Sequence, residues 1–283
     1  MEARNINDEL KNFYQKSKDK MKIFLINSDN YEKESDGRGN QRYEFEYVGD
    51  KEEQICSPAG RSIQIDENYL KRNPIQTCNG KAISKLIDYD QNTLNILVPE
   101  QYKKYEKKIV KNYKENFYFQ KVTIDNYFRK NMNKPKNMLK KDKLSIHIIY
   151  VKTNQSYFTY DSDTGNGKNQ IIDPIAVIYT GGVDSSCIAS MYAGDTVSGS
   201  IYFEDNSKKQ GYAYRKVEAL EQKLGIYQFN SVTNIYGQAA SNLVIIRQKV
   251  MWQSAILLAV ILCSIVFITI AVSGYYFSKQ QRL

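Results

Sequence analysis

The residues with the clearest chemical potential lie in one glycine-containing turn, Thr180-Gly-Gly-Val-Asp-Ser-Ser. The turn follows the apolar segment Pro174–Tyr179, which is typical of a buried strand, and precedes a stretch with helical character. Glycines let backbone N–H groups approach a phosphate closely, and a helix N-terminus favours negative charge. The candidate residues of a nucleotide-phosphate loop are therefore Gly181, Gly182, Asp184 and Ser185.

The same segment resembles the pyrophosphatase loop of the ATP pyrophosphatases, whose usual pattern is Ser-Gly-Gly-x-Asp-Ser. A membrane-anchored nucleotide-binding enzyme that uses Thr180–Ser186 is thus one hypothesis. Against it, Thr180 replaces the usual serine, and few β–α units follow before the apolar C-terminal segment. Such a fold needs several parallel strands with crossover helices. A glycine turn followed by an aspartate helix cap explains the same residues without a ligand.

No other segment carries a recognised catalytic or metal-binding pattern. His147, the single histidine, lies in the alternating segment Ile146–Tyr150, which is typical of a packed or surface position in a strand. Asp161, Asp163 and Asn166 share a loop, but their spacing does not fit the glycine and terminal glutamate of an EF-hand. We therefore expect a chain that is not itself catalytic, with no cofactor and no metal site.

The four cysteines are expected to differ in their environments. Cys263 lies in the long apolar segment near the C-terminus and Cys187 in an apolar helical stretch, so we expect both thiols to be free and inert. Cys56 and Cys78 bracket a loop and could form a disulfide if their domain lies outside the cytoplasm. Because the chain has one histidine, a Cys/His zinc site is not expected.

Apolar periodicity predicts an α+β domain around these residues. Leu144–Lys152 and Ser156–Tyr160 are predicted to form a β-hairpin, because two strand-like segments flank the short polar turn Thr153–Gln155. The other predicted strands are Met21–Asn27, Gln41–Val48, Ser62–Asp66, Thr93–Pro99, Pro174–Tyr179 and Ser200–Phe203. The predicted helices are Asn7–Ser17, a short helix that begins at Asn68 and is stopped at Pro74, Glu100–Asn116, Tyr212–Leu224 and residues 238–249.

One segment near the C-terminus is too apolar for the surface of a soluble domain. Val250–Ser278 contains no Asp, Glu, Lys or Arg, and roughly 20 apolar residues suffice to cross a bilayer as a helix. Trp252 at one end and Tyr275 and Tyr276 at the other suit the two membrane–water interfaces. The sequence therefore predicts an extramembrane domain over residues 1–249, a single transmembrane helix over 250–277 and a short basic tail over 278–283.

The charges that flank this helix leave its orientation open. Arg247 and Lys249 precede it, and Lys279 and Arg282 follow it, so the positive-inside rule gives no clear preference. Residues 1–8 lack the apolar region of a signal peptide. We expect either a tail-anchored protein with a cytoplasmic domain, or a portion of a longer protein with an upstream targeting helix.

The net charge of +9 comes largely from the segment Tyr102–Lys143. One interpretation is an anionic partner such as lipid headgroups, wall polymer or nucleic acid. The other is a solvated helix face and loop without a partner. Because no recognised nucleic-acid-binding motif accompanies the charge, nucleic acid is not an expected partner.

Four segments, taken in their order along the chain, carry a further resemblance. They are Asn68–Ile75, Asn95–Glu106, Ile149–Tyr160 and Asp173–Val177. Together they resemble the bacteriocin-associated integral membrane proteins of Gram-positive bacteria, which are immunity proteins of the lactococcin-972 type. The likeness extends over most of residues 60–277, and it lies in the order of the segments rather than in any single motif.

This resemblance implies a multi-spanning, permease-like protein that works with a separate ABC ATPase subunit. Its large domain would lie outside the cell, with residues 250–277 as the second membrane helix and residues 278–283 in the cytoplasm. The first and later helices of that pattern are not in this sequence, so we expect a portion of a longer protein. The resemblance transfers no catalytic residues.

The leading hypothesis is therefore the extracytoplasmic domain and one membrane helix of an ABC-type permease linked to bacteriocin export or self-immunity. Such a module would couple ATPase-driven helix motion to a bacteriocin, another peptide or a partner outside the membrane. A tail-anchored adaptor without a ligand is a further alternative to the nucleotide-binding enzyme.

Overall fold

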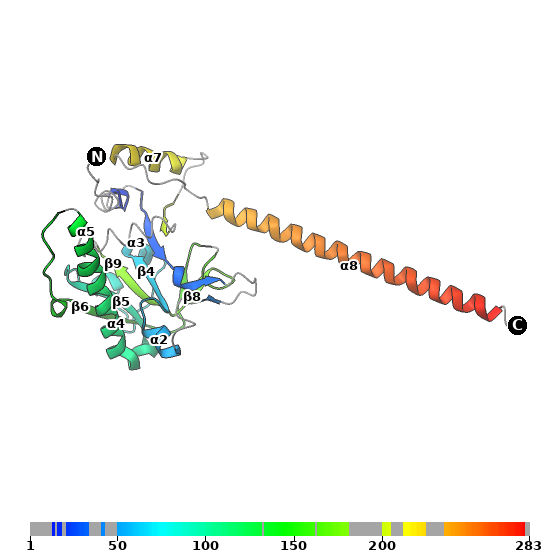
Figure 1. The fold of residues 1–283 in the computed structure, drawn as a ribbon, viewed down its shortest axis with the longest axis horizontal. Helices are drawn as coiled ribbons and strands as arrows, with labels where there is room; N and C mark the ends of the chain where they lie inside the picture. Colours follow the sequence, from blue (N-terminus) through cyan, green and yellow to red (C-terminus); the bar gives the residue numbers. More distant parts are fainter. Residues whose placement is uncertain are drawn as a thin grey trace. The chain divides into compact units, whose positions relative to one another are not determined.

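The computed structural model describes residues 13–14, 16–18, 21–33, 41–42, 50–131, 133–161, 163–180, 200–204, 212–224 and 235–280. The chain divides into two units, Met1–Val232 and Thr233–Leu283. The first contains a sheet with helices on its faces, and the second is a single long helix, α8 (Ile235–Gln280) (Figure 1).

A six-stranded mixed sheet forms the centre of the first unit. Its strands are β1 (Phe24–Asn27), β4 (Ser62–Asp66), β5 (Thr93–Pro99), β6 (Ser145–Val151), β9 (Ile175–Tyr179) and β10 (Ile201–Tyr202). Their order is β10-β1-β4-β9-β5-β6. β4 is parallel to β9 and β5 to β6, whereas the other pairings are antiparallel. The predicted α+β class is confirmed.

Both faces of this sheet are buried, as the strand β5 shows. All of its residues from Thr93 to Pro99 are buried. Leu94, Ile96 and Val98 lie in the hydrophobic cluster on one face, whereas Leu97 lies in the cluster on the other. Because successive side chains of a strand point to opposite faces, each face needs its own cover.

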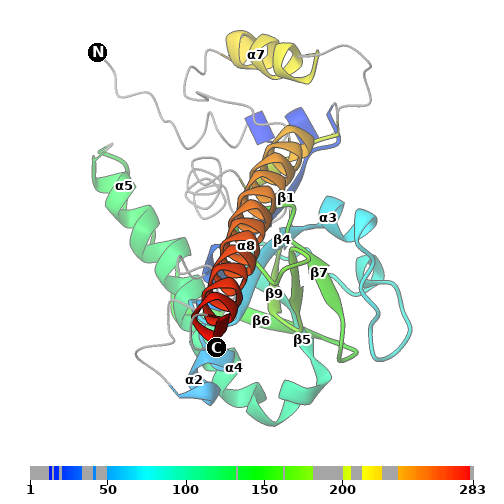
Figure 2. The ribbon, with the colours of Figure 1, turned by 90° about the vertical axis from the view of Figure 1, so that its right-hand side faces the viewer.

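A long helical segment covers one face (Figure 2). Ile109, Tyr113 and Phe117 recur every four residues along it and pack against the sheet. Its parts are a 3-10 stretch (Glu100–Tyr105), α4 (Glu106–Tyr118), a π-helical stretch (Phe119–Ile124) and α5 (Asp125–Asn131), and the short helix α2 (Lys51–Cys56) packs beside it.

The helix predicted to end at Asn116 therefore continues to Asn131. The π-helical stretch brings two consecutive side chains, Lys121 and Val122, into the interior. The ammonium of Lys121 donates a hydrogen bond to the carbonyl oxygen of Gln91. Apolar periodicity is interrupted across this stretch because a buried lysine occupies one of the inward positions.

The opposite face is covered by smaller elements. Tyr69 and Tyr157 are fully buried there against Ile65 and Ile178 of the sheet. The covering elements are α3 (Glu67–Arg72), a 3-10 turn (Ile83–Lys85) and a two-stranded sheet of β7 (Ser156–Phe158) and β8 (Gln170–Ile172). The other elements are 3-10 turns at Asp29–Tyr31 and Lys141–Lys143, the strand pair β2 (Glu32–Lys33) and β3 (Gln41–Arg42), and α7 (Tyr212–Leu224).

The predicted hairpin of Leu144–Lys152 with Ser156–Tyr160 is wrong. β6 pairs in parallel with β5, and β7 pairs with β8 in the separate small sheet. The turn between them has Asn154 in the left-handed backbone region, with a φ of 59°. Gln155 is bonded to the backbone of Gln76 rather than across a hairpin. These contacts direct β7 onto the face of the main sheet.

Helix α8 is the whole described part of the second unit. Its segment Leu243–Tyr275 is by length and composition a candidate membrane span, and none of its side chains is buried. At about 1.5 Å per residue this segment is longer than the ~30 Å hydrocarbon core of a bilayer. Trp252 and Tyr275 are exposed on it. The predicted domain boundary at residue 249 falls inside α8, because the helix already begins at Ile235.

A buried carboxylate joins the N-terminal helical residues to the sheet. Asp66 caps α3 by accepting a hydrogen bond from the backbone N–H of Tyr69 at 2.7 Å, and it accepts another from the hydroxyl of Tyr14. Burial raises the pKa of Asp66, while the bonds from Tyr14 and Tyr69 oppose that rise. Asp66 is therefore a group whose protonation is linked to folding.

We predict that Asp66 makes the folded state less stable as the pH rises. In the unfolded chain an aspartate loses its proton near pH 4, whereas in the folded protein Asp66 keeps it to higher pH. The contribution of Asp66 to the free energy of unfolding is thus fully present below about pH 4. It is lost as the pH rises through the pKa that Asp66 has in the folded protein. Asp66→Asn keeps the cap oxygen but does not titrate, so the stability of the variant relative to the wild type should increase with pH.

Chemical unfolding of the detergent-solubilised chain at several pH values would measure this difference. The control variant is Asp142→Asn, at an exposed position, and its stability relative to the wild type should not increase with pH in this way. A stability difference between wild type and Asp66→Asn that does not vary with pH would contradict the prediction.

Candidate functional site

The predicted phosphate loop begins where β9 ends. Thr180, directly after β9, is buried. Gly181, Gly182, Asp184 and Ser185 lie outside the described residues. β9 has β4 as a parallel neighbour and β5 as an antiparallel one. The described sheet is therefore mixed at the strand that leads into the loop, unlike the parallel sheet that the nucleotide hypothesis requires.

The candidate disulfide between Cys56 and Cys78 is not formed, and this prediction needs correction. Both thiols are free: Cys56 is buried and Cys78 is exposed. Cys56 ends α2 and packs in the core beneath α4, whereas the backbone of Cys78 is bonded to Tyr150 of β6. Burial raises the pKa of the Cys56 thiol to about 11, so this thiol is inert near neutral pH.

His147 has a structural role, as its place in an alternating strand predicts. Its Nε2 lies 2.9 Å from the carbonyl oxygen of Leu86. Asn95, the neighbour of His147 across β5 and β6, is fully buried and forms two hydrogen bonds with the backbone of Asp88. The two side chains thus fix the segment that carries Leu86 and Asp88 to the sheet.

The described residues contain no group of three or more His, Cys, Asp or Glu side chains that could hold a metal ion. The loop that carries Asp161, Asp163 and Asn166 is held by local bonds. Asp161 accepts the backbone N–H of Asp163 at 2.9 Å, and Asn166 accepts that of Lys168 at 2.9 Å. These are turn contacts of the kind that Asp and Asn side chains make in loops.

A polar cluster around Asp173 joins several segments of the fold by hydrogen bonds. Asp173 is nearly buried, and its φ of 52° lies in the left-handed region. Its carboxylate accepts hydrogen bonds from the backbone N–H groups of Asn154, at 2.9 Å, and Gln155, at 3.0 Å. A third comes from the side-chain amide of Gln101 at 2.8 Å. Bonds of this kind to an ionised acceptor are stronger than those between neutral groups.

Further contacts extend the cluster to α3 and the segment that follows it. Gln155 accepts the backbone N–H of Gln76 at 2.6 Å and donates to the carbonyl oxygen of Gln76 at 3.0 Å. Tyr69 donates from its hydroxyl to the carbonyl oxygen of Phe158 at 3.0 Å. All four segments of the family resemblance, which lie far apart in the sequence, are therefore joined by direct hydrogen bonds.

Tyr102 lies beside this cluster and adds a phenol to it. Burial raises the pKa of Tyr102, whereas the neighbouring guanidinium of Arg61 opposes that rise. Arg61 precedes β4, and its carbonyl oxygen accepts the N–H of Ile175 at the start of β9. The cluster therefore holds together the N-terminal ends of β4 and β9 and the C-terminal ends of β5 and β6.

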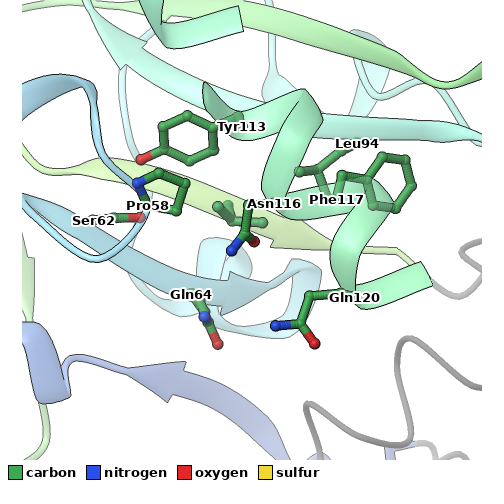
Figure 3. A pocket seen from close by; sticks show the side chains of 9 residues that line it. Pro58, Ser62, Gln64, Leu94, Tyr113, Asn116, Phe117 and Gln120 are labelled. Carbon is green, nitrogen blue, oxygen red and sulfur yellow. The ribbon is translucent and has the colours of Figure 1, made fainter. Parts of the chain in front are cut away.

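A small pocket lies between the sheet and α4 (Figure 3). The amide side chains of Gln64, Asn116 and Gln120 lie together on one side of it (Figure 3). Gln64 accepts a hydrogen bond from the hydroxyl of Tyr179. The enclosed space is about 20 Å³, which is room for about one water molecule and far below the several hundred Å³ of a small-molecule site.

Sequence reasoning missed Asp173 as the centre of a cluster. The available signals were an aspartate before Pro174 and the polar turn Thr153–Gln155, both typical of loops. Neither signal identifies the partner of the other.

No protein-family model matches the chain, and curated proteins and solved structures give no match either.

We predict that Asp173→Ala loosens the segment between β6 and β7. The change removes the acceptor of three part-buried hydrogen bonds and leaves their donors without this partner, which costs about 1–3 kcal/mol of unfolding free energy. Asp173→Asn keeps one oxygen acceptor and tolerates the left-handed backbone, so its loss should be smaller. Hydrogen exchange at the amides of Asn154 and Gln155 would measure the local effect.

Asp142→Ala, at an exposed position, is the matched control and should change the unfolding free energy by less than about 0.5 kcal/mol. Equal exchange at Asn154 and Gln155 in wild type and Asp173→Ala would contradict the role assigned to the carboxylate.

Proposed function

We propose that this chain is the extracytoplasmic domain and one membrane helix of an ABC-type permease linked to bacteriocin export or self-immunity. In this function the domain contacts a bacteriocin, another peptide or a protein partner outside the membrane. A separate ABC ATPase subunit supplies the energy. The domain itself performs no chemistry and transmits helix motion.

The observation that carries the proposal is the hydrogen-bonded cluster of Asp173. The segments that resemble the bacteriocin-associated membrane proteins are separated by long stretches of sequence, yet they are bonded to one another in the fold. Their contact means that the four segments belong to one unit of the fold, as a single extramembrane domain requires.

The continuity of α8 supports the mechanical part of the proposal. The helix runs without interruption from Ile235, before the candidate span, to Gln280, after it. An α-helix is stiff over this length because each turn is hydrogen-bonded to the next. Rotation or displacement of the span is consequently carried along the helix to Ile235, where α8 begins.

The nucleotide-binding enzyme receives less support. Among the described strands, two of the five pairings in the main sheet are parallel. The described pocket is too small for a nucleotide. We therefore predict that Mg-ATP does not change the thermal unfolding temperature of the chain. A rise that is lost in the double variant Gly182→Val, Asp184→Ala would instead favour the enzyme.

Membrane topology tests the proposal directly. Cys78 is exposed and serves as the reporter of the domain, in a background where Cys187 and Cys263 are serine. Ser278→Cys reports on the tail. We predict that a membrane-impermeant maleimide labels Cys78 on intact cells at mildly alkaline pH, because the raised pKa of this thiol slows labelling at lower pH. The tail cysteine should stay unlabelled.

Cys56 provides an internal control. Its buried thiol should react only after unfolding, which shows that the labelled domain is folded. Labelling of the tail on intact cells, with Cys78 reactive only after permeabilisation, would place the domain in the cytoplasm. That result would remove the permease proposal and leave the tail-anchored alternatives.

A further inference from the structure

The charge of the chain is concentrated on one stretch of the fold. Tyr102–Lys143 contains 14 of the 40 Lys and Arg residues and 4 of the 31 Asp and Glu residues. This stretch therefore carries a net charge of +10, and the rest of the chain carries −1. The excess of positive charge is therefore local to this stretch and is not spread over the whole chain.

This stretch also exposes large apolar side chains among its lysines. Phe119 is 48% exposed, Tyr127 63% and Met138 78%. Outside α8, only Tyr89, Phe158 and Ile172 join them as exposed large hydrophobic residues in the described part of the chain. Half of these residues thus lie within the basic stretch.

The exposed positions follow one side of the helical segment that begins with α4. Lys107, Lys111, Phe119 and Tyr127 are separated by four or eight residues, and Glu115 and Thr123 occupy the two positions between them at this spacing. The side chain of Glu115 is paired with Lys141 at 2.7 Å, so its negative charge is compensated. We call Lys104, Lys107, Lys111, Phe119, Tyr127 and Lys130 the basic-aromatic stripe.

Hydrogen bonds fix the chain that follows the stripe to the helix. Asp125 accepts a bond from Arg129 at 2.7 Å and another from the side-chain amide of Asn137 at 2.9 Å. Asn126 and Asn137 exchange two more bonds, at 2.7 and 3.1 Å. The loop that carries Met138 is therefore held against α5 in advance of any partner.

We propose that the basic-aromatic stripe docks on an anionic lipid surface. Lysines attracted to acidic headgroups, together with rings inserted at headgroup depth, are the combination by which proteins bind membrane interfaces. The inference depends on the membrane anchor alone and not on the transporter function. The stripe and the Asp173 cluster are separate features, and the lipid partner is proposed for the stripe alone.

The connection to α8 favours lipid over a soluble polyanion. Leu224 ends α7 and Leu243 begins the candidate span. The chain from Leu224 to Ile235, where α8 begins, reaches at most about 40 Å, and the helical residues up to Leu243 add about 12 Å. A domain tethered in this way meets the headgroups at a high effective concentration, so even weak attraction for each lysine suffices for docking.

The test uses the full chain in lipid nanodiscs, one set zwitterionic and one containing anionic phosphatidylglycerol. An environment-sensitive dye is attached to Thr123→Cys, an exposed position between Phe119 and Tyr127. The background replaces the native cysteines except buried Cys56 by serine. We expect higher, blue-shifted emission in anionic discs, a loss of this change at high salt, and no change for a dye at Ser84→Cys on the other face.

Substitution of Lys104, Lys107, Lys111 and Lys130 by glutamine should lower the ratio of docked to undocked domain by about fivefold for each lysine. The matched control replaces four exposed lysines elsewhere by glutamine and should leave the ratio unchanged. These are Lys71, Lys81, Lys85 and Lys168. Phe119→Ser with Tyr127→Ser should weaken docking while keeping its dependence on salt.

Equal emission from Thr123→Cys in the two kinds of nanodisc would overturn the proposal. So would an equal loss of docking in the stripe variant and the matched control. If RNA or polyglutamate raises the emission in zwitterionic discs while anionic lipid does not, the stripe binds a soluble polyanion and the lipid assignment is wrong.

Discussion

The burial of β5 and β9 on both faces is the constraint on which the rest of the domain depends. Each buried Ile, Leu or Val of these strands stabilises the fold by roughly 1.5–3 kcal/mol, but only if both faces are shielded from water. α4 shields one face, and α3 with β7 and β8 shields the other. Because these covers come from separate parts of the chain, neither half of the sequence can bury the sheet alone.

Polar side chains fix the covers in position once the apolar residues have brought them together. Asp66 joins α3 to the N-terminal helical residues, Asn95 and His147 hold the loop beside β5, and Asp173 holds the segment between β6 and β7. Each of these groups is buried or half-buried and bonded mainly to backbone atoms. Such hydrogen bonds specify geometry more than they add to stability, because the same polar groups bond to water in the unfolded chain.

Local patterns predicted the elements of this fold well, and pairings between elements poorly. The strand β5 and the helix α7 match their predicted bounds, since their apolar spacing is uninterrupted. The hairpin prediction failed because Asn154 and Gln155 turn toward Gln76 and Asp173, which are distant in the sequence. The prediction ended the long helix too early, because the buried Lys121 has a polar side chain that interrupts the apolar pattern. In the candidate site, the sequence could mark Asp173 as a loop residue but could not name its partners.

β6 ends the described sheet, and this position has a consequence for copies of the protein that share a membrane. An unpaired strand edge is a template for pairing with another chain, which leads to aggregation. The segment Gln76–Cys78 occupies the carboxyl half of that edge, through a bridge from Thr77 to Val151 and a 3.0 Å bond from the N–H of Cys78 to Tyr150. Edge-to-edge association through β6 is thereby restricted to the amino half of this strand, where Ser145 is exposed.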